Sequence, residues 1–275
     1  MKVKLNGSFL ASLDVDQICK LVNLTKYSKS KNLIYIQNGF VVKKEAVVKN
    51  DDEIYIIPKD MEIHEDDMQC FLSSRHSNFV IEKLKNARVA VMGLGGLGSN
   101  TAMNLARSGV GFIKLIDFDI VDPSNINRQN YFLDQIGMKK SDATLANLKR
   151  VNPYIKIESC NVYLDKSNYD EYLEDVDIIV EAFDNPLCKA DITRHFIEHY
   201  KTRFNDKFLL TASGMAGFYK SNIIKTKRLK ERLYICGDFK NSAREFEGLM
   251  APRVNIVAGH QSNCVIRILM QNMEV

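Results

Sequence analysis

The sequence predicts a mixed α/β protein in which a small α+β unit precedes a larger α/β unit. In the first 60 residues, short strand patterns and turn signals follow one another closely. After residue 87, apolar runs of strand length alternate with helical stretches, which is typical of a mostly parallel sheet covered by helices. The 275-residue length and 45% hydrophobic content are enough for two cores.

The first 60 residues have the element order of a β-grasp domain. Val3 and Leu5 alternate with polar residues, and residues 15–22 have helical spacing. A strand at 33–36 is followed by the hairpin signal Asn38-Gly39 and further strands at 40–42 and 54–57. We therefore expect a β-grasp domain over 1–60, a charged linker over 61–74 and the second domain over 75–275.

A glycine motif follows the first buried strand of the second domain. The apolar run from Val89 to Met92 leads directly into Gly93, Gly95 and Gly98, spaced as G-x-G-x-x-G, and residues 99–109 form the next predicted helix. Glycine permits close backbone approach, and the free N–H groups of a helix N-terminus attract anions. This order predicts a phosphate site.

An acidic residue ends the second strand of the same domain. The apolar run 112–116 ends at Asp117, roughly 20 residues beyond the glycines, where such folds place the acid that holds a ribose hydroxyl. Strand, glycine loop, helix, strand and acid in this order predict a nucleotide-binding domain of Rossmann type.

The polar, turn-rich stretch 117–130 is typical of a functional loop. We expect it to bring Asn125, Arg128 and Gln129 over the glycine loop, with Lys140 following at the start of a helix over 141–150. A pyrophosphate can be held by backbone N–H groups, whereas triphosphate chemistry needs Arg and Lys to stabilise leaving oxygens. The two cations therefore favour ATP over NAD.

A further strand over 176–182 leads to Asp184. A carboxylate at the carboxyl end of a parallel strand is placed to hold Mg²⁺ through water, although Asp184 is equally suited to cap a helix beginning at Pro186. Beyond it we expect a buried strand at 209–213, an antiparallel extension at 218–225 and 232–235, a mobile surface segment at 237–252 containing Arg244, Glu245 and Glu247, and a final helix at 255–270.

Composition excludes several classes of protein. The net charge of +4 comes without long tracts of one sign, so we expect no nucleic-acid partner. With neither a signal peptide nor an apolar run long enough to cross a bilayer, we expect a cytoplasmic protein without membrane association. The six cysteines are scattered singly, which predicts free thiols and no structural zinc.

Two resemblances to known families make these predictions specific. Asn6-Gly7, residues 36–39 and residues 51–54 resemble the sulfur carrier ThiS, but the segment continues through Pro58 without a terminal diglycine, so it cannot be a substrate in cis. The rest resembles the ThiF/MoeB adenylyltransferases, relatives of ubiquitin-activating enzymes, in Gly93-Leu94-Gly95-Gly96-Leu97-Gly98, Asp117-Phe118-Asp119, 124–129, 137–140 and Asp184-Asn185. The tail 248–254 with His260-Gln261 resembles a short ThiF subgroup without zinc cysteines.

The resemblance implies a reaction and the residues that support it. In that family the carboxylate of a carrier attacks the α-phosphate of ATP, which gives an acyl-adenylate and pyrophosphate, here with a role in thiamine thiazole formation. Carried over position by position, it implies phosphate binding by Gly93, Gly95, Gly96, Gly98, Asn125, Arg128 and Lys140, ribose binding by Asp117, Mg²⁺ binding by Asp184, and loop support by Gln129.

The resemblance also implies partners. It implies a homodimer in which Arg75 corresponds to the arginine lent to the partner's active site. Its acceptor is a ThiS-like carrier, with a cysteine desulfurase or a thiazole synthase as further partners.

Three alternatives stay open from the sequence. The same chemistry can serve another acceptor, such as a molybdopterin carrier, a tRNA base or a peptide. A non-catalytic regulatory ATP-binding protein is disfavoured by Arg128, Lys140 and Asp184, and an NAD-dependent oxidoreductase by the lack of a hydride-site pattern among the five histidines. Cys236 is either a reactive thiol or a buried strand cysteine.

Overall fold

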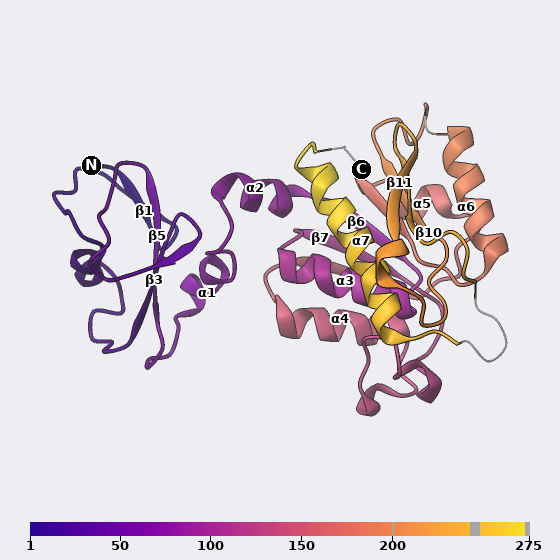
Figure 1. The fold of residues 1–275 in the computed structure, drawn as a ribbon, viewed down its shortest axis with the longest axis horizontal. Helices are drawn as coiled ribbons and strands as arrows, with labels where there is room; N and C mark the ends of the chain where they lie inside the picture. The colour runs from indigo at the N-terminus through magenta and orange to yellow at the C-terminus, as the bar shows by residue number, and fades with distance from the viewer. Residues whose placement is uncertain (200, 243–247, 273–275) are drawn as a thin grey trace. The chain divides into compact units, whose positions relative to one another are not determined.

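The chain folds into two compact units, seen in a computed structural model that describes residues 1–199, 201–242 and 248–272 (Figure 1). The first unit spans Met1–Glu82 and the second Lys83–Val275. Each unit has its own sheet and its own hydrophobic core.

The first unit is a five-stranded β-grasp sheet with strand order β2-β1-β5-β3-β4. The central pair β1 and β5 is parallel, and the neighbouring pairs are antiparallel. Ile18 and Leu21 of the 3₁₀ helix η1 (Ile18–Leu24) pack against one face, so the predicted helix begins three residues late and is a 3₁₀ helix. The strands are β1 (Val3–Leu5), β2 (Ser8–Leu10), β3 (Leu33–Gln37), β4 (Phe40–Val42) and β5 (Asp52–Pro58).

The opposite face of this sheet is covered by the unit's own helix α1 (Glu65–Leu72). Ile36 and Tyr55 are paired across β3 and β5 and form a second small core with Phe71 of α1. The segment 61–74, expected to be a linker, therefore contains a packed helix. The first unit ends within α2 (Asn78–Asn86).

The second unit has a seven-stranded mixed sheet of order β11-β12-β10-β9-β6-β7-β8. All neighbours are parallel except the edge pair β11 and β12. This confirms the predicted Rossmann-like α/β fold with a mixed sheet. The strands are β6 (Arg88–Met92), β7 (Phe112–Ile116), β8 (Lys156–Cys160), β9 (Ile178–Glu181), β10 (Phe208–Ala212), β11 (Lys225–Lys230) and β12 (Leu233–Gly237).

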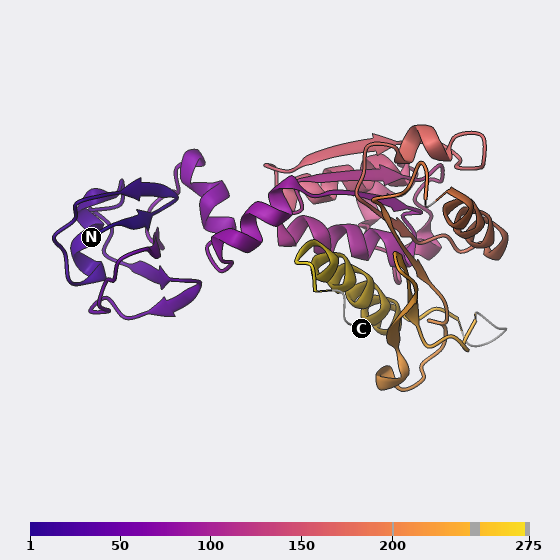
Figure 2. The ribbon, with the colours of Figure 1, turned by 90° about the horizontal axis from the view of Figure 1, so that it is seen from above.

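Helices cover both faces of this sheet (Figures 1 and 2). The helices α3 (Gly96–Ser108) and α7 (Ala251–Leu269) lie side by side on one face with α4 (Lys140–Val151), whereas α5 (Tyr169–Leu173) and α6 (Pro186–His199) pack on the other. Short 3₁₀ turns complete the loops: η2 (Pro123–Asn125), η3 (Leu133–Gln135) and η4 (Ser221–Ile223). No helix among the described residues is long and apolar enough to cross a membrane.

Three elements of the second unit differ from the prediction. The strand expected at 218–225 is displaced along the chain. Residues 218–224 contain the short helix η4, and the antiparallel edge strand β11 begins at Lys225. The final helix begins at Ala251, with Pro252 in its first turn, where the missing N–H costs nothing. The strand β8 was not predicted, because its residues mix charged and apolar types and are at most half-buried.

Candidate active site

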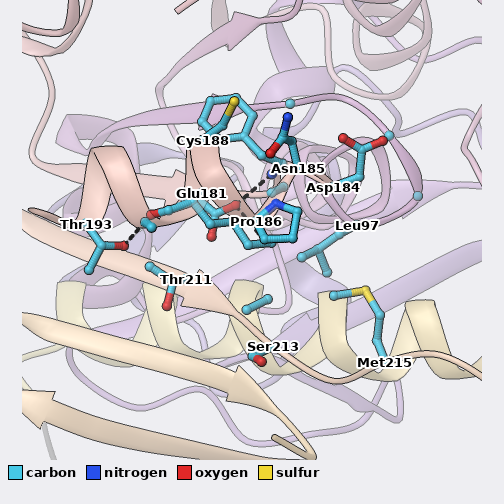
Figure 3. Close-up of a pocket in the computed structure, with 18 of the residues that line it drawn as sticks. Leu97, Glu181, Asp184, Asn185, Pro186, Cys188, Thr193, Thr211, Ser213 and Met215 are labelled. Atoms are coloured by element: carbon cyan, nitrogen blue, oxygen red, sulfur yellow. Dashed lines mark hydrogen bonds and ion pairs between the residues drawn. The ribbon is translucent and has the colours of Figure 1, made fainter. Parts of the chain in front are cut away.

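The site lies where the chain reverses its direction of winding across the sheet. From β6 the order runs through β7 and β8 on one side and through β9 and β10 on the other. Open α/β sheets bind ligands in the crevice outside the carboxyl ends of the strands at such a point. A cavity of about 1000 Å³ lies there and is lined by residues that follow β6, β7, β9, β10 and β12 (Figure 3).

The glycine loop forms one wall of the cavity, and its glycines have different tasks. Gly93 has a φ of +82°, and a Cβ there would lie 2.9 Å from the carbonyl oxygen of Ala182. A Cβ on Gly98 would lie 1.8 Å from the carbonyl oxygen of Gly93, so Gly98 allows α3 to pack against the loop. Gly95 and Gly96 line the cavity at the N-terminus of α3. Because Gly95 and Gly96 have no side chains, nothing of their own covers the backbone N–H groups at the start of the helix. Such exposed N–H groups can bind a phosphate.

Asp117 lines the cavity and organises the loops around it. Its Oδ2 accepts the N–H of Leu94 at 2.5 Å, and its Oδ1 accepts the N–H of Asp119 at 2.8 Å. Only 8% of the residue is exposed, and this burial raises the pKa of the carboxyl. Each oxygen keeps a second lone pair, so Asp117 can still accept a ribose hydroxyl while it holds the glycine loop.

Of the three residues of the polar loop after β7 that were predicted to lie over the glycine loop, two line the cavity and one does not. Asn125 accepts the N–H of Asp122 at 3.1 Å in the cap of η2 and is not among the residues that line the cavity. Arg128 lines the cavity, and its Nη1 donates to the Ser124 carbonyl at 2.9 Å. Gln129 lines it too, is 9% exposed, and has an Oε1 without a hydrogen-bond partner among the described residues.

Lys140 is the second cation at the cavity. It is 7% exposed, and its Nζ lies 2.9 Å from Oδ2 of Asp119. Asp119 thus aims the ammonium while leaving two of its three donors for a ligand. Arg75 belongs to the first unit, where it is exposed after α1, and it does not line this cavity.

Asp184 faces the cavity beside Asn185 (Figure 3). The sequence left two roles open for Asp184, as a metal ligand or as the cap of α6. In the structure the cap is Asn185, whose Oδ1 accepts the N–H of Leu187 at 2.8 Å. Asn185 therefore caps the helix, and the exposed Asp184 carboxylate is left for a ligand. The described residues hold no group of three or more His, Cys, Asp or Glu side chains able to bind a metal by themselves.

An ion pair between the buried Glu181 and the partly exposed Lys189 was not predicted. Oε1 of Glu181 accepts the N–H of Phe183 at 2.7 Å and lies 2.8 Å from Nζ of Lys189, whereas Oε2 has no partner of standard geometry among the described residues. Burial raises the pKa of Glu181. Glu181 directly follows the apolar run 178–180. A glutamate at the end of a buried strand is itself buried and needs a cation, and this pattern could have indicated the ion pair.

A second ion pair, which is buried, lies next in sequence to Val254 and is bonded to Asn241, two residues that line the cavity. Arg253 of α7 pairs with Asp238, and its Nη1 donates to the Tyr219 carbonyl at 2.8 Å. Oδ1 of Asp238 accepts the N–H groups of Lys240 and Asn241, each at 2.9 Å. Asp238 was expected in a mobile surface segment, yet it ties the loops after β10 and β12 to α7. Arg244, Glu245 and Glu247 of that segment lie outside the described residues.

Two cysteines of the second unit, Cys236 and Cys188, bear on the chemistry of the site. Cys236 is fully buried in β12, and this burial raises its pKa to about 12, which disfavours the thiolate. The structure therefore supports a buried strand cysteine over a reactive thiol. Cys188 lines the cavity, with its Sγ 3.6 Å from the Tyr163 hydroxyl.

A bare glycine loop, a buried acid after the second strand and two cations around one cavity define a nucleotide-binding α/β protein. The chain belongs to the ThiF family, whose model matches residues 68–275, and the model of the ThiS-like ubiquitin family matches residues 1–68. Both resemblances seen in the sequence are thereby confirmed.

Curated relatives share part of their length with this chain. The molybdopterin-synthase adenylyltransferase of Haemophilus influenzae is 39% identical over 114 residues, which is 41% of this chain and 47% of that protein. The tRNA threonylcarbamoyladenosine dehydratase of Bacillus subtilis is 35% identical over 120 residues, 43% of this chain and 47% of that protein. The matched stretch thus spans about half of each relative.

Solved structures share the fold. The ATP complex of the Escherichia coli tRNA N6-threonylcarbamoyladenosine dehydratase TcdA superimposes with a TM-score of 0.67 at 19% identity, covering 77% of this chain and 98% of that one. The E. coli MccB structure with ATP gives a TM-score of 0.55 at 21% identity, covering 80% of this chain and 68% of that one.

Proposed function

We propose that the second unit adenylates the C-terminal carboxylate of a separate ThiS-like carrier protein, using ATP and releasing pyrophosphate. The observation that carries this proposal is one cavity that combines the bare glycine loop with Arg128, Lys140 and Asp184. Membership of the ThiF family supports it, as do the relatives named adenylyltransferases.

The residues suit this chemistry because the attack brings two anions together. The backbone N–H groups at Gly95 and Gly96 would fix the phosphate for in-line attack, and Arg128 and Lys140 would neutralise charge on the phosphates. A carboxylate nucleophile is already ionised at neutral pH, so the site needs no general base. Asp117 would hold the ribose hydroxyls.

Two further residues would work through the loop that follows Asp117. Asn125 would act by holding the cap of η2, which shapes the segment before Arg128. The Oε1 of the buried Gln129, without a partner among the described residues, is placed to accept a hydrogen bond from the nucleotide or from a water bound beside it.

The cavity also fits Mg²⁺. This ion commonly binds through one or two carboxylates, substrate phosphates and several waters, so the exposed Asp184 carboxylate is a sufficient protein ligand. When bound, Mg²⁺ would supply positive charge at the phosphates. Asn185 contributes by taking over the cap of α6, which leaves Asp184 to hold the ion.

The fused first unit supports a ThiS-like protein as the acceptor. This unit matches the ThiS-like family, yet its last strand continues through Pro58 into α1 and offers no free carboxylate. A separate diglycine-ended carrier, in thiamine thiazole formation, is therefore the proposed acceptor, with a cysteine desulfurase or a thiazole synthase as a further partner. We also propose a homodimer in which Arg75 serves the partner's site.

The test is ATP–pyrophosphate exchange with purified protein, Mg²⁺ and a separate ThiS carrier. We expect exchange that depends on the carrier and is lost in Asp184→Ala. The matched control is Asp206→Ala, since Asp206 is also exposed but does not line the cavity. Measurable ATP binding without exchange would contradict this acceptor, and parallel reactions with a molybdopterin carrier, a peptide or tRNA would then identify another one.

A further inference from the structure

The edge strand of the second sheet is basic and exposed. Four of the six residues of β11 are Lys or Arg, and none is acidic. Five of the six are exposed, and among the described residues β11 pairs only with β12. We call Lys225–Lys230 the basic edge. It presents main-chain N–H and C=O groups and positive charge along the same line.

The register of the sheet connects this basic edge with the cavity. Lys227 is paired with Ile235, and Ile235 with Thr211. Leu210 is paired with Val180, so the next position places Thr211 beside Glu181. Directly paired residues point to the same face of a sheet. One row of side chains therefore runs from the buried carboxylate of Glu181 to the ammonium of Lys227.

The cavity extends along this row. Glu181, Thr211 and Ile235 line it, and so does Leu229 of the basic edge itself. Figure 3 shows Thr211 and Thr193 beside Glu181, on the opposite side of the pocket from Asp184. An extended chain that crosses β11, β12 and β10 on this face would thus enter the cavity that holds Asp184.

The positive charge of the basic edge favours a negatively charged partner. Lysines on an edge strand oppose pairing with a second copy, because like charges would face each other. The same lysines favour an acidic strand, which can also use the free main-chain groups. RNA fits less well, because β11 contains no aromatic residue for base stacking. At the cavity, Leu229 of β11 and Ile235 of β12 are both apolar.

We propose that the basic edge is the docking site for the acceptor, an acidic protein that pairs with β11 while its chain end crosses to the cavity. This inference rests on the proposed adenylation, since it requires an acceptor whose chain end reaches Asp184. The partner is defined here by its chemistry, which is an extended, negatively charged segment ending in a free carboxylate.

The first test measures binding of a fluorescent peptide that alternates Glu with Val and ends in Gly-Gly. Lys225→Glu/Lys227→Glu/Lys230→Glu should weaken its binding at least about fivefold, because three attractive charge pairs become repulsive. The control Lys85→Glu/Arg107→Glu/Lys149→Glu makes the same change of charge at exposed positions on α2, α3 and α4 and should change binding less than twofold. ATP affinity should be unaltered in both variants.

Two results of this test would overturn the inference. Equal binding of the acidic peptide to wild type and to the β11 variant is one, and equal binding of a Gln-for-Glu peptide to wild type is the other. An oligouridine RNA that binds the wild type more tightly than the peptide, and loses binding in the β11 variant, would assign the edge to nucleic acid instead.

Kinetics separate this inference from the proposed function. With a ThiS carrier, the β11 variant should raise the KM for the carrier at least about fivefold and leave kcat unchanged. If wild type gives no exchange while peptide binding still depends on β11, the proposed acceptor fails and the docking edge remains. If exchange proceeds with the same KM in wild type and the variant, the docking edge fails and the proposed function remains.

Discussion

Gly98→Ala tests the packing of the glycine loop. The new methyl group would lie 1.8 Å from the Gly93 carbonyl oxygen and 3.2 Å from Cβ of Ala182. Both neighbours are held by the sheet, since the N–H of Gly93 donates to the Ile116 carbonyl and the N–H of Ala182 to the Met92 carbonyl. The start of α3 or the loop must therefore shift by roughly 1 Å, and such overpacking costs about 1 to 3 kcal/mol.

The consequence for the proposed reaction should exceed that for stability. A displacement of ~1 Å in a group that positions the substrate can cost about 100-fold in rate. We therefore expect Gly98→Ala to lower ATP–pyrophosphate exchange about 100-fold and the free energy of unfolding by about 1 to 3 kcal/mol. Exchange assays and urea denaturation measure the two effects.

The opposite end of α3 provides a control for this prediction. Gly109 ends the helix with a φ of +88°, and a Cβ added there would have no described atom within 4 Å beyond its chain neighbours. Gly109→Ala should cost about 1 kcal/mol of backbone strain and leave exchange per folded molecule unchanged. Wild-type exchange in Gly98→Ala, or equal losses in both variants, would refute the argument that Gly98 sets the loop for phosphate binding.

Three further predictions concern charge. Arg128→Ala should abolish exchange and leave the free energy of unfolding within about 0.5 kcal/mol of wild type, because the side chain is a loop cation outside the core; turnover at the wild-type rate would contradict its role. Arg253→Met should destabilise the second unit by about 3 to 5 kcal/mol in urea denaturation, because it leaves the Asp238 carboxylate buried without its cation, and an effect under about 1 kcal/mol would show that backbone N–H groups suffice. Burial lowers the pKa of His260 below 6.5, so the folded state favours the neutral ring. The free energy of unfolding should therefore be unaffected by this group above pH 6.5 and should fall as the pH drops below 6.5. His260→Gln should reduce the dependence of the free energy of unfolding on pH in denaturation curves measured from pH 7.5 to 5.

The parts of the site that could be predicted depend on contacts between neighbours in sequence. The glycine loop joins a strand directly to a helix. The apolar run from Val89 and the spacing of Gly93, Gly95 and Gly98 were therefore sufficient to predict the strand, the loop and the helix in that order. The same holds for Lys140, which begins α4 as predicted within one residue. Asn125 shows the limit of such reasoning, because its short amide side chain serves the nearby backbone of η2 instead of the cavity.

The parts that could not be predicted depend on distant segments. The ion pair of Arg253 and Asp238 needs the loop after β12 to meet the start of α7, and the carbonyl of Tyr219 comes from a third segment. No local pattern encodes such a meeting. The helix α1 was missed for a related reason: its three acidic residues suggest a solvated linker, and only the tertiary contact of Phe71 with Ile36 and Tyr55 shows what the helix covers.

The helix α1 also bears on why the proposed reaction needs a separate acceptor. A carrier must present a free carboxylate at the end of its last strand, whereas here β5 ends at Pro58 and the chain continues into α1. The hydroxyl of Tyr27 donates to Asp67 at 2.7 Å and accepts the N–H of His64 at 3.1 Å, which fixes that continuation against the first unit. Cleavage after Pro58 would still leave a chain end without the two terminal glycines of a ThiS-like carrier. The first unit thus matches the ThiS-like family without a free carboxylate after β5, so the proposed reaction requires a carboxylate from another molecule.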